Sequence, residues 1–135
     1  MAFANAEELY KVFGLMMDKV MKDQELAGKL SAANLVVGLK VPNIDAFITL
    51  ECLDTLRVSF GPPTIDIDVT TVNNDTNFNR FWQGKLNLTV AMSKGEVKAQ
   101  GAVFKMLKVL PVIDPMYQMF TDSLREAGRE DLVIE

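Results

Sequence analysis

The chain has 135 residues, of which 49% are hydrophobic and 24% are charged, and its net charge is −4. This length and composition indicate one globular domain, residues 1–135, that can bury a sizeable core. An acidic chain without a basic tract argues against nucleic acid as a partner, because phosphate binding needs clustered lysine and arginine. It also argues against stable adsorption to anionic lipid, although a local basic patch allows transient membrane contact.

The sequence contains no histidine and a single cysteine, Cys52. The missing histidine excludes Ser-His-Asp and Cys-His catalytic arrangements and removes the commonest metal ligand. We expect no enzyme activity, catalytic residue, metal site or cofactor, while chemistry by carboxylates alone remains possible. A lone cysteine forms no intramolecular disulfide, and neither a secretory signal nor an apolar run of membrane-spanning length is visible, so we expect a cytoplasmic protein.

Helical periodicity dominates the chain up to Leu30. Asn5 can cap a helix, with Glu8 placed as in a capping box, and apolar residues recur at helical spacing from Leu9 to Met21. A break near Asp23 would leave a second short helix as far as Leu30. One continuous helix to Leu30 is an equally good interpretation.

Apolar and polar residues then alternate in four segments, which predicts four strands: Leu35–Val41, Phe47–Cys52, Leu56–Phe60 and Ile65–Val69. In the fourth segment, Asp66 and Asp68 alternate with isoleucine and valine, as in a strand with one buried and one solvated face. Paired carboxylates can also serve acid–base chemistry or bind a hard cation, but the binary pattern of a wet strand face explains these two better.

The second half of the chain is predicted to be mostly helical. The polar segment Asn73–Asn77 favours the start of a helix that carries Phe78, Phe81 and Trp82. The segment Leu86–Met92 fits either a strand or a helical turn, and its alternation favours a strand. The remaining predicted elements are a strand, two helices and a loose tail: Glu96–Gln100, Phe104–Leu110, Met116–Leu124 and Arg129–Glu135. Strands flanked by helices in this order predict an α+β domain with helices covering one face of a twisted sheet.

Three segments resemble the sterol carrier protein type 2 lipid-binding domain family, and the resemblance covers nearly the whole chain. Lys22–Leu30 is similar to the family's short second helix, and Phe78–Leu86 to its aromatic helix that closes in Gly-Lys-Leu. Ala91–Gly101 is similar to its most recognisable block, which joins a Met-Ser segment to a glycine-bounded strand. The resemblance implies a five-stranded mixed, mainly antiparallel sheet with helices packed on one face, enclosing a hydrophobic tunnel. It also implies that Leu86–Met92 is a short helix.

The resemblance further implies non-enzymatic binding, with transfer or presentation of a fatty acid, acyl thioester, sterol or phospholipid. We expect a continuous apolar cavity of at least roughly 300 Å³ between the sheet and the segment from Phe104 to Leu124. Methionine suits such a wall because its unbranched chain reshapes around different lipid tails. The side chains expected to line the cavity are aromatic residues, methionines and leucines: Phe78, Phe81, Trp82, Met92, Phe104, Met106, Leu107, Leu110, Met116, Met119 and Phe120.

Two other classes of function remain open at this point. The chain could be an interaction or scaffold module whose apolar groove receives a partner or assists a lipid-metabolising enzyme, and the sequence leaves a homodimer open. It could also be a small enzyme that uses aspartate and lysine, which the missing histidine disfavours. Five lysines form the one basic-leaning region, and they fit a solvated face better than a site for phosphates or headgroups: Lys85, Lys94, Lys98, Lys105 and Lys108.

Overall fold

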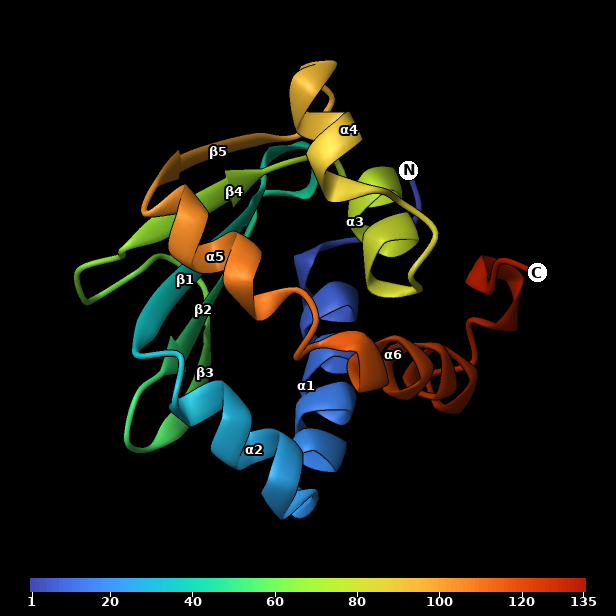
Figure 1. Cartoon of the computed structure of the whole chain (residues 1–135). Coiled ribbons are helices and arrows are strands. Elements are labelled where there is room, and N and C mark those ends of the chain that lie inside the picture. Colours follow the sequence, from blue (N-terminus) through green and yellow to red (C-terminus); the bar gives the residue numbers. More distant parts are fainter.

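Two helices precede the first strand in the computed structural model, which describes residues 1–135 (Figure 1). Helix α1, Ala6–Lys22, begins at Asn5, whose side-chain oxygen accepts a hydrogen bond of 2.9 Å from the Glu8 backbone N–H. Asp23 follows α1 and caps helix α2, Gln24–Ser31, by accepting from the Leu26 backbone N–H at 3.0 Å. The predicted break near Asp23 is therefore confirmed, and the continuous helix is excluded.

The five strands form one open mixed sheet in the order β3-β2-β1-β4-β5. They span β1 Leu35–Val41, β2 Ala46–Cys52, β3 Leu56–Phe60, β4 Val69–Val72 and β5 Lys98–Gly101. Only the β1–β4 pair is parallel, and the three other pairs are antiparallel. The expected five-stranded, mainly antiparallel sheet is confirmed, and the helices cover one of its faces (Figure 1).

The fourth strand starts later than the sequence pattern predicts. The segment 61–68 is a loop, and β4 begins only at Val69. The backbone N–H of Asp68 donates to the Val36 carbonyl (2.9 Å), and the Asp68 carboxylate accepts from the Val36 N–H (2.8 Å). Asp66 and Asp68 are both exposed, as expected, but they lie in this loop and not on a strand, and Asp68 fixes the loop to the start of β1.

Four helices follow the third and fourth strands: α3 Asp75–Trp82, α4 Leu88–Ser93, α5 Val103–Val109 and α6 Asp114–Glu126. Short 3-10 turns lie at Pro42–Ile44 and Glu130–Leu132. The strand that alternation favoured across Leu86–Met92 is wrong, and the short helix that the resemblance implied is confirmed. Asn87 caps this helix by accepting from the Val90 N–H at 3.1 Å, and the helix buries Leu88 and Ala91, which lie three residues apart.

The C-terminal segment is not the loose tail that the sequence suggested. The Leu132 carbonyl accepts hydrogen bonds from the side-chain amides of Asn79 (3.1 Å) and Gln83 (2.9 Å). The Ile134 N–H donates to the Gln83 side-chain oxygen at 2.8 Å. Arg129 also forms an ion pair with Glu8 of α1. These contacts fasten the last residues to α3 and to the start of α1.

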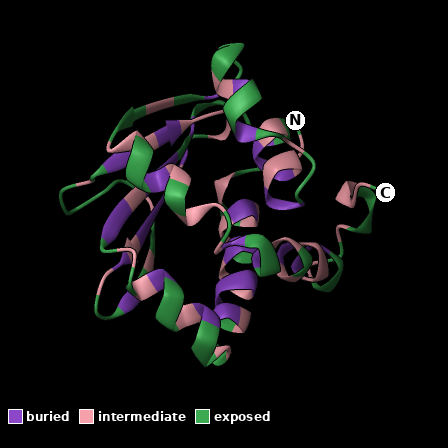
Figure 2. Ribbon diagram, viewed as in Figure 1, coloured by how far each residue is buried: buried purple, intermediate pink, exposed green.

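The buried residues divide into two hydrophobic clusters, which we call the main core and the small cluster. The main core comprises 22 buried residues and is built around α1, which buries six side chains against the sheet and the other helices (Figure 2). The small cluster comprises six residues on β1, β4, α4, the α4–β5 connection and α5: Leu35, Val69, Leu88, Ala91, Val97 and Met106. The segment from α4 to α5 is thus held by a far smaller apolar area than the rest of the molecule.

The turn that leads from β5 into α5 requires glycine at position 101. Gly101 has φ +102°, and a Cβ added there would stand 2.2 Å from the Asp68 carbonyl oxygen. We predict that Gly101→Ala lowers the free energy of unfolding by about 2–4 kcal/mol, measured by urea denaturation. The matched control is Gly28→Ala in α2, where a Cβ meets no atom within 4 Å. That change should stabilise the protein by about 0.5–1 kcal/mol, and equal effects of the two variants would contradict the packing at Gly101.

The N-terminal segment is tied to the fold by a buried carboxylate. Asp75 is 1% exposed and accepts hydrogen bonds from the backbone N–H groups of Ala2 (2.7 Å) and Phe3 (2.9 Å) and from the Asn43 side chain (2.8 Å). Burial acts to raise the pKa of Asp75, but these hydrogen bonds and the charge of the amino terminus hold it below its ordinary value. The ionised carboxylate therefore stabilises the folded state.

The depressed pKa gives Asp75 a definite pH signature. Its stabilisation should be fully present above the ordinary carboxyl pKa of 3.8 and should be lost as the pH falls through the lower folded-state value. We predict that Asp75→Asn costs about 1–3 kcal/mol at pH 7 and that the difference from wild type narrows in acid. Urea denaturation across pH checks this, with Asp66→Asn as the exposed control. A difference that is independent of pH would show that the charge of Asp75 contributes nothing.

Candidate functional site

An apolar cavity of about 80 Å³ lies where the main core meets the small cluster. Seventeen of its 19 lining residues are hydrophobic. The cavity lies within the expected region, but its volume is well below the roughly 300–1,000 Å³ of typical ligand pockets and below the size that we predicted. The side chains of the two clusters fill most of the space between the sheet and the helices.

The sheet forms one wall of the cavity. Val37 and Leu39 of β1, Leu50 and Cys52 of β2 and Leu56 of β3 line it. The first four alternate along their strands with residues that point to the other face, so a single register places all of them on the helix side. Burial raises the pKa of the Cys52 thiol to about 11, so Cys52 is a neutral, apolar part of this wall.

An aromatic corner contributed by α3 closes one side. The ring of Trp82 meets Phe13 of α1 edge-on, with centroids 5.2 Å apart, and meets Phe81 in the same manner at 5.2 Å. Phe78 stands 6.2 Å from Trp82. The rings of Phe78, Phe81 and Trp82 all line the cavity, whereas Phe13 lies behind them in the main core. Edge-to-face packing of this kind fixes ring orientations, so this corner is a rigid wall.

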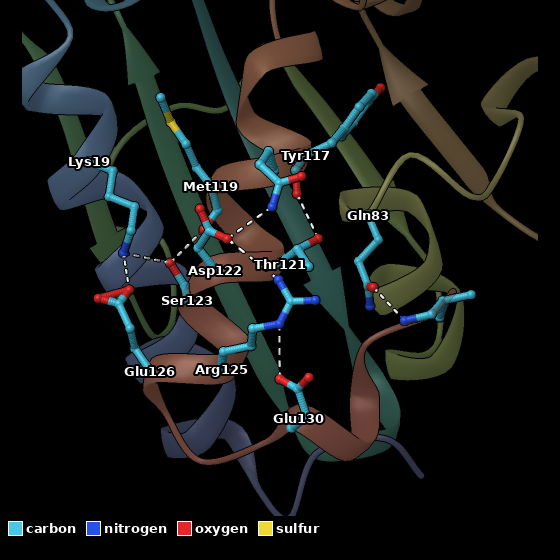
Figure 3. A network of polar contacts seen from close by, with 12 residues as sticks. Lys19, Gln83, Tyr117, Met119, Thr121, Asp122, Ser123, Arg125, Glu126 and Glu130 are labelled. Atoms are coloured by element: carbon cyan, nitrogen blue, oxygen red, sulfur yellow. Dashed lines mark hydrogen bonds and ion pairs between the residues drawn. The ribbon is translucent and has the colours of Figure 1, made fainter.

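Helices α5 and α6 supply the remaining wall, and they are held in different ways. On α6, the Ser123 hydroxyl donates to the Met119 carbonyl (2.7 Å) and accepts from Lys19 of α1 (3.2 Å), and Lys19 also pairs with Glu126 (Figure 3). Arg125 pairs with Glu130 at 3.0 Å in the same network. Helix α5 has no side-chain N-cap, and no hydrogen bond or ion pair of its side chains holds it. Apolar contacts and backbone hydrogen bonds alone keep α5 in place.

The structure brings six of the eleven predicted lining residues together at the cavity: Phe78, Phe81, Trp82, Met106, Leu110 and Met116. Phe120 is fully buried in the main core, with its ring 6.3 Å from Phe78. Met92 and Leu107 pack beside the small cluster, and Met119 beside the main core. Phe104 is 82% exposed on the outer side of α5. Phe104 therefore lies outside this cavity, and the assignment of the lining residues to a ligand site stays a prediction.

Sequence reasoning did not name the lining residues of the sheet or two polar residues, Thr71 and Asn73. Alternation along β1 and β2 was the available signal for the inner face, since it grouped Val37 with Leu39 and Leu50 with Cys52. Thr71 of β4 is 8% exposed, and its neighbour Asn73 follows the end of the same strand. Both lie at one part of an otherwise apolar lining. Predicting that these two residues line the cavity would have required the register of β4, and this strand begins later than the sequence pattern indicated.

The acidic side chains and the lone cysteine are the remaining candidate site residues. No three side chains among histidine, cysteine, aspartate and glutamate gather into a group that could hold a metal ion. Asp75 is the one buried charged residue, and its oxygens are occupied by the N-terminal backbone and Asn43. None of the helices combines the length and apolar character that crossing a bilayer requires.

Comparison with solved structures identifies the fold. The sterol carrier protein domain 2 of Helicoverpa armigera matches with a TM-score of 0.61 and 20% identity, over 79% of this chain and 85% of that one. Sterol carrier protein 2 of Yarrowia lipolytica, in its apo form, matches with a TM-score of 0.58 and 19% identity, over 83% of this chain and 88% of that one. The chain has the sterol carrier protein 2 fold. No family model and no curated protein matches its sequence.

The same fold also occurs inside a larger enzyme. The stereoselective inverting sec-alkylsulfatase Pisa1 from Pseudomonas sp. matches with a TM-score of 0.57 and 20% identity over 64% of this chain. The chain spans only 14% of that enzyme's length. The match therefore concerns one part of the sulfatase and carries the sterol carrier protein 2 fold without its reaction.

Trp82 offers a direct optical probe of the cavity, because it is the sole tryptophan and lines the apolar space. We predict that a long-chain fatty acid brominated on its chain quenches Trp82 fluorescence in a saturable manner, since a bromine atom in contact with indole quenches its emission. A short-chain brominated acid of the same charge is the control and should quench only weakly. Equal quenching by both acids would show that no apolar chain enters beside Trp82.

Proposed function

We propose that this protein binds the apolar part of a lipid in the cavity between its two hydrophobic clusters and carries or presents that lipid without covalent chemistry. One observation carries the proposal: 17 of the 19 residues that line the cavity are hydrophobic, and none is charged. A water molecule finds few hydrogen-bond partners in such a space. An apolar chain that enters it is stabilised by about 25 cal/mol for each Å² of its surface removed from water. The fold is also that of proteins named as sterol carriers.

The cavity must enlarge to accept such a ligand, and the structure supports one way of doing so. The side of α6 is fixed by polar contacts to α1, whereas α5 is held by apolar contacts to the small cluster. Met106 of α5, Met116 of α6 and Met17 of α1 line the space, and their unbranched side chains can adopt other rotamers at low cost. We propose that a ligand parts the small cluster from the main core and replaces the apolar contacts that it breaks.

The residues that line the cavity require an apolar ligand, but they do not select one particular lipid. A charged headgroup finds no counter-ion in the cavity and would remain at its opening in water, because burying an unpaired charge is costly. Fatty acids, acyl thioesters, sterols and phospholipids all satisfy this condition. Recognition would rest on apolar contacts, so tails of different length should differ by only about 1–3 kcal/mol in binding free energy. The hydroxyl of Thr71 and the amide of Asn73 are the polar groups that a buried ligand oxygen could meet.

A cavity-filling variant tests the proposal without adding a charge. Leu110 lines the cavity at the end of α5, whereas Val112, two residues on, lies outside the lining. We predict that Leu110→Trp weakens binding of a fluorescent fatty acid by at least about tenfold, which corresponds to about 1.4 kcal/mol. Val112→Trp, the matched control, should bind like wild type. Displacement titration gives the affinities, and thermal unfolding shows that both variants remain folded.

Two results would contradict the carrier proposal. The first is that Leu110→Trp, while folded, binds the fatty acid as tightly as wild type. The second is that wild-type protein binds no fatty acid, sterol or phospholipid but forms a stable complex with a second protein. The second result would favour the interaction module that the sequence left open.

A further inference from the structure

The outward side of α5 combines the most exposed aromatic residue of the fold with two lysines. Phe104 is 82% exposed, and Lys105 and Lys108 are exposed beside it. Phe104 and Lys108 are four residues apart and Lys105 and Lys108 three, so they share one side of the helix. We call these three residues the α5 surface. Single exposed apolar residues are common on protein surfaces, and what distinguishes Phe104 is the pair of lysines on the same side of its helix.

The stretch of sequence that forms α4, β5 and α5 has a net charge opposite in sign to that of the whole protein. Between Leu88 and Leu110 the chain carries four lysines and one glutamate, Glu96, which is a net charge of +3. The rest of the chain carries −7, and together these give the net charge of −4. Neither α4 nor α5 contains an acidic residue. The stretch that bears Phe104 is therefore basic within an acidic chain, and Asp68, whose backbone carbonyl accepts from the Ala102 N–H just before α5, is an acidic residue next to it.

We propose that the α5 surface docks on anionic phospholipid bilayers, with Phe104 inserted among the acyl chains at the interface and Lys105 and Lys108 against the headgroup phosphates. An aromatic ring flanked by lysines matches the order of layers at a membrane surface, where apolar chains lie directly beneath anionic groups. A bilayer fits better than a protein groove, because three residues on a seven-residue helix offer too small an area for a stable protein interface. Two lysines and one ring give weak, reversible contact.

The docking surface and the cavity lie on opposite sides of the same helix. Phe104, Lys105 and Lys108 face outward, whereas Met106 and Val109 line the cavity. Since no polar side-chain contact fixes α5, a membrane that binds its outer side can pull its inner side away from the small cluster. This coupling rests on the proposed lipid binding, but docking itself does not depend on it.

Vesicle co-sedimentation tests the docking directly. Wild-type protein is titrated with vesicles of phosphatidylcholine alone and of phosphatidylcholine with about a quarter phosphatidylserine, at low and at physiological salt. We expect partition to the anionic vesicles only, and weaker partition at higher salt. Phe104→Ser should reduce the partition coefficient about tenfold, and Lys105→Gln and Lys108→Gln about fivefold each. The matched controls are Ile65→Ser, at another exposed apolar residue, and Lys29→Gln on α2, and both should partition like wild type.

Three outcomes would overturn the proposal. Wild-type protein that does not partition to anionic vesicles at low salt excludes the membrane as occupant. If the α5 variants and the control variants lower vesicle partition to the same extent, the contact lies elsewhere on the protein. Self-association in sedimentation velocity that Phe104→Ser abolishes, without vesicle binding, assigns the surface to a second copy of the chain.

Fatty acid binding without vesicles separates this proposal from the carrier function. The α5 variants should bind a fluorescent fatty acid like wild type, because their altered side chains point away from the cavity. If wild-type protein partitions to vesicles as expected but binds no fatty acid, the carrier proposal fails and the docking surface stands.

Discussion

The edge-to-face contact between Phe13 of α1 and Trp82 of α3 is the interaction on which the rest of the arrangement depends. It joins the long N-terminal helix to a short helix that follows β4, and Phe78 extends the contact to Phe120 of α6. Three helices distant in sequence are thereby held at fixed distances on one face of the sheet. Phe78 and Trp82 also line the small apolar space, so the contact that joins the helices forms one wall of the cavity as well.

That space separates two parts of the molecule that are held together by different numbers of buried apolar residues. The main core unites α1, α2, α3 and α6 with β1, β2 and β3, whereas the small cluster holds α4 and α5 over β1 and β4. Local opening requires less free energy where fewer apolar contacts must be broken, so we expect the fold to open first on the side formed by α4 and α5. The proposed uptake of a lipid and the proposed contact with a bilayer both use this weaker side, while the aromatic corner and the α6 network stay in place.

Much of the fold followed from local patterns, and what failed was non-local. Asn5, Asp23 and the alternation in the first three strands act within a few residues, so the sequence predicted α1, α2, β1, β2 and β3 closely. The start of β4 depends on the hydrogen bonds between Asp68 and Val36, which lie 32 residues apart, and alternation alone could not reveal them. Leu86, Leu88 and Val90 fit a strand pattern, but a helix begins at Leu88, and the Asn87 side chain caps its first turn. The helical lining of the cavity was partly foreseen from its aromatic residues and methionines. Its volume was overestimated, because it depends on how those side chains fill the space.

The central claim is that an apolar ligand occupies the space between the two clusters. Native mass spectrometry of the purified protein, alone and after incubation with a long-chain fatty acid, tests it most directly, because the mass difference reports both the ligand and its stoichiometry. The account predicts one bound lipid per chain, either retained through purification or taken up on incubation, and released when the protein unfolds. Protein that stays ligand-free under both conditions, or that acquires several lipids without saturation, would contradict it.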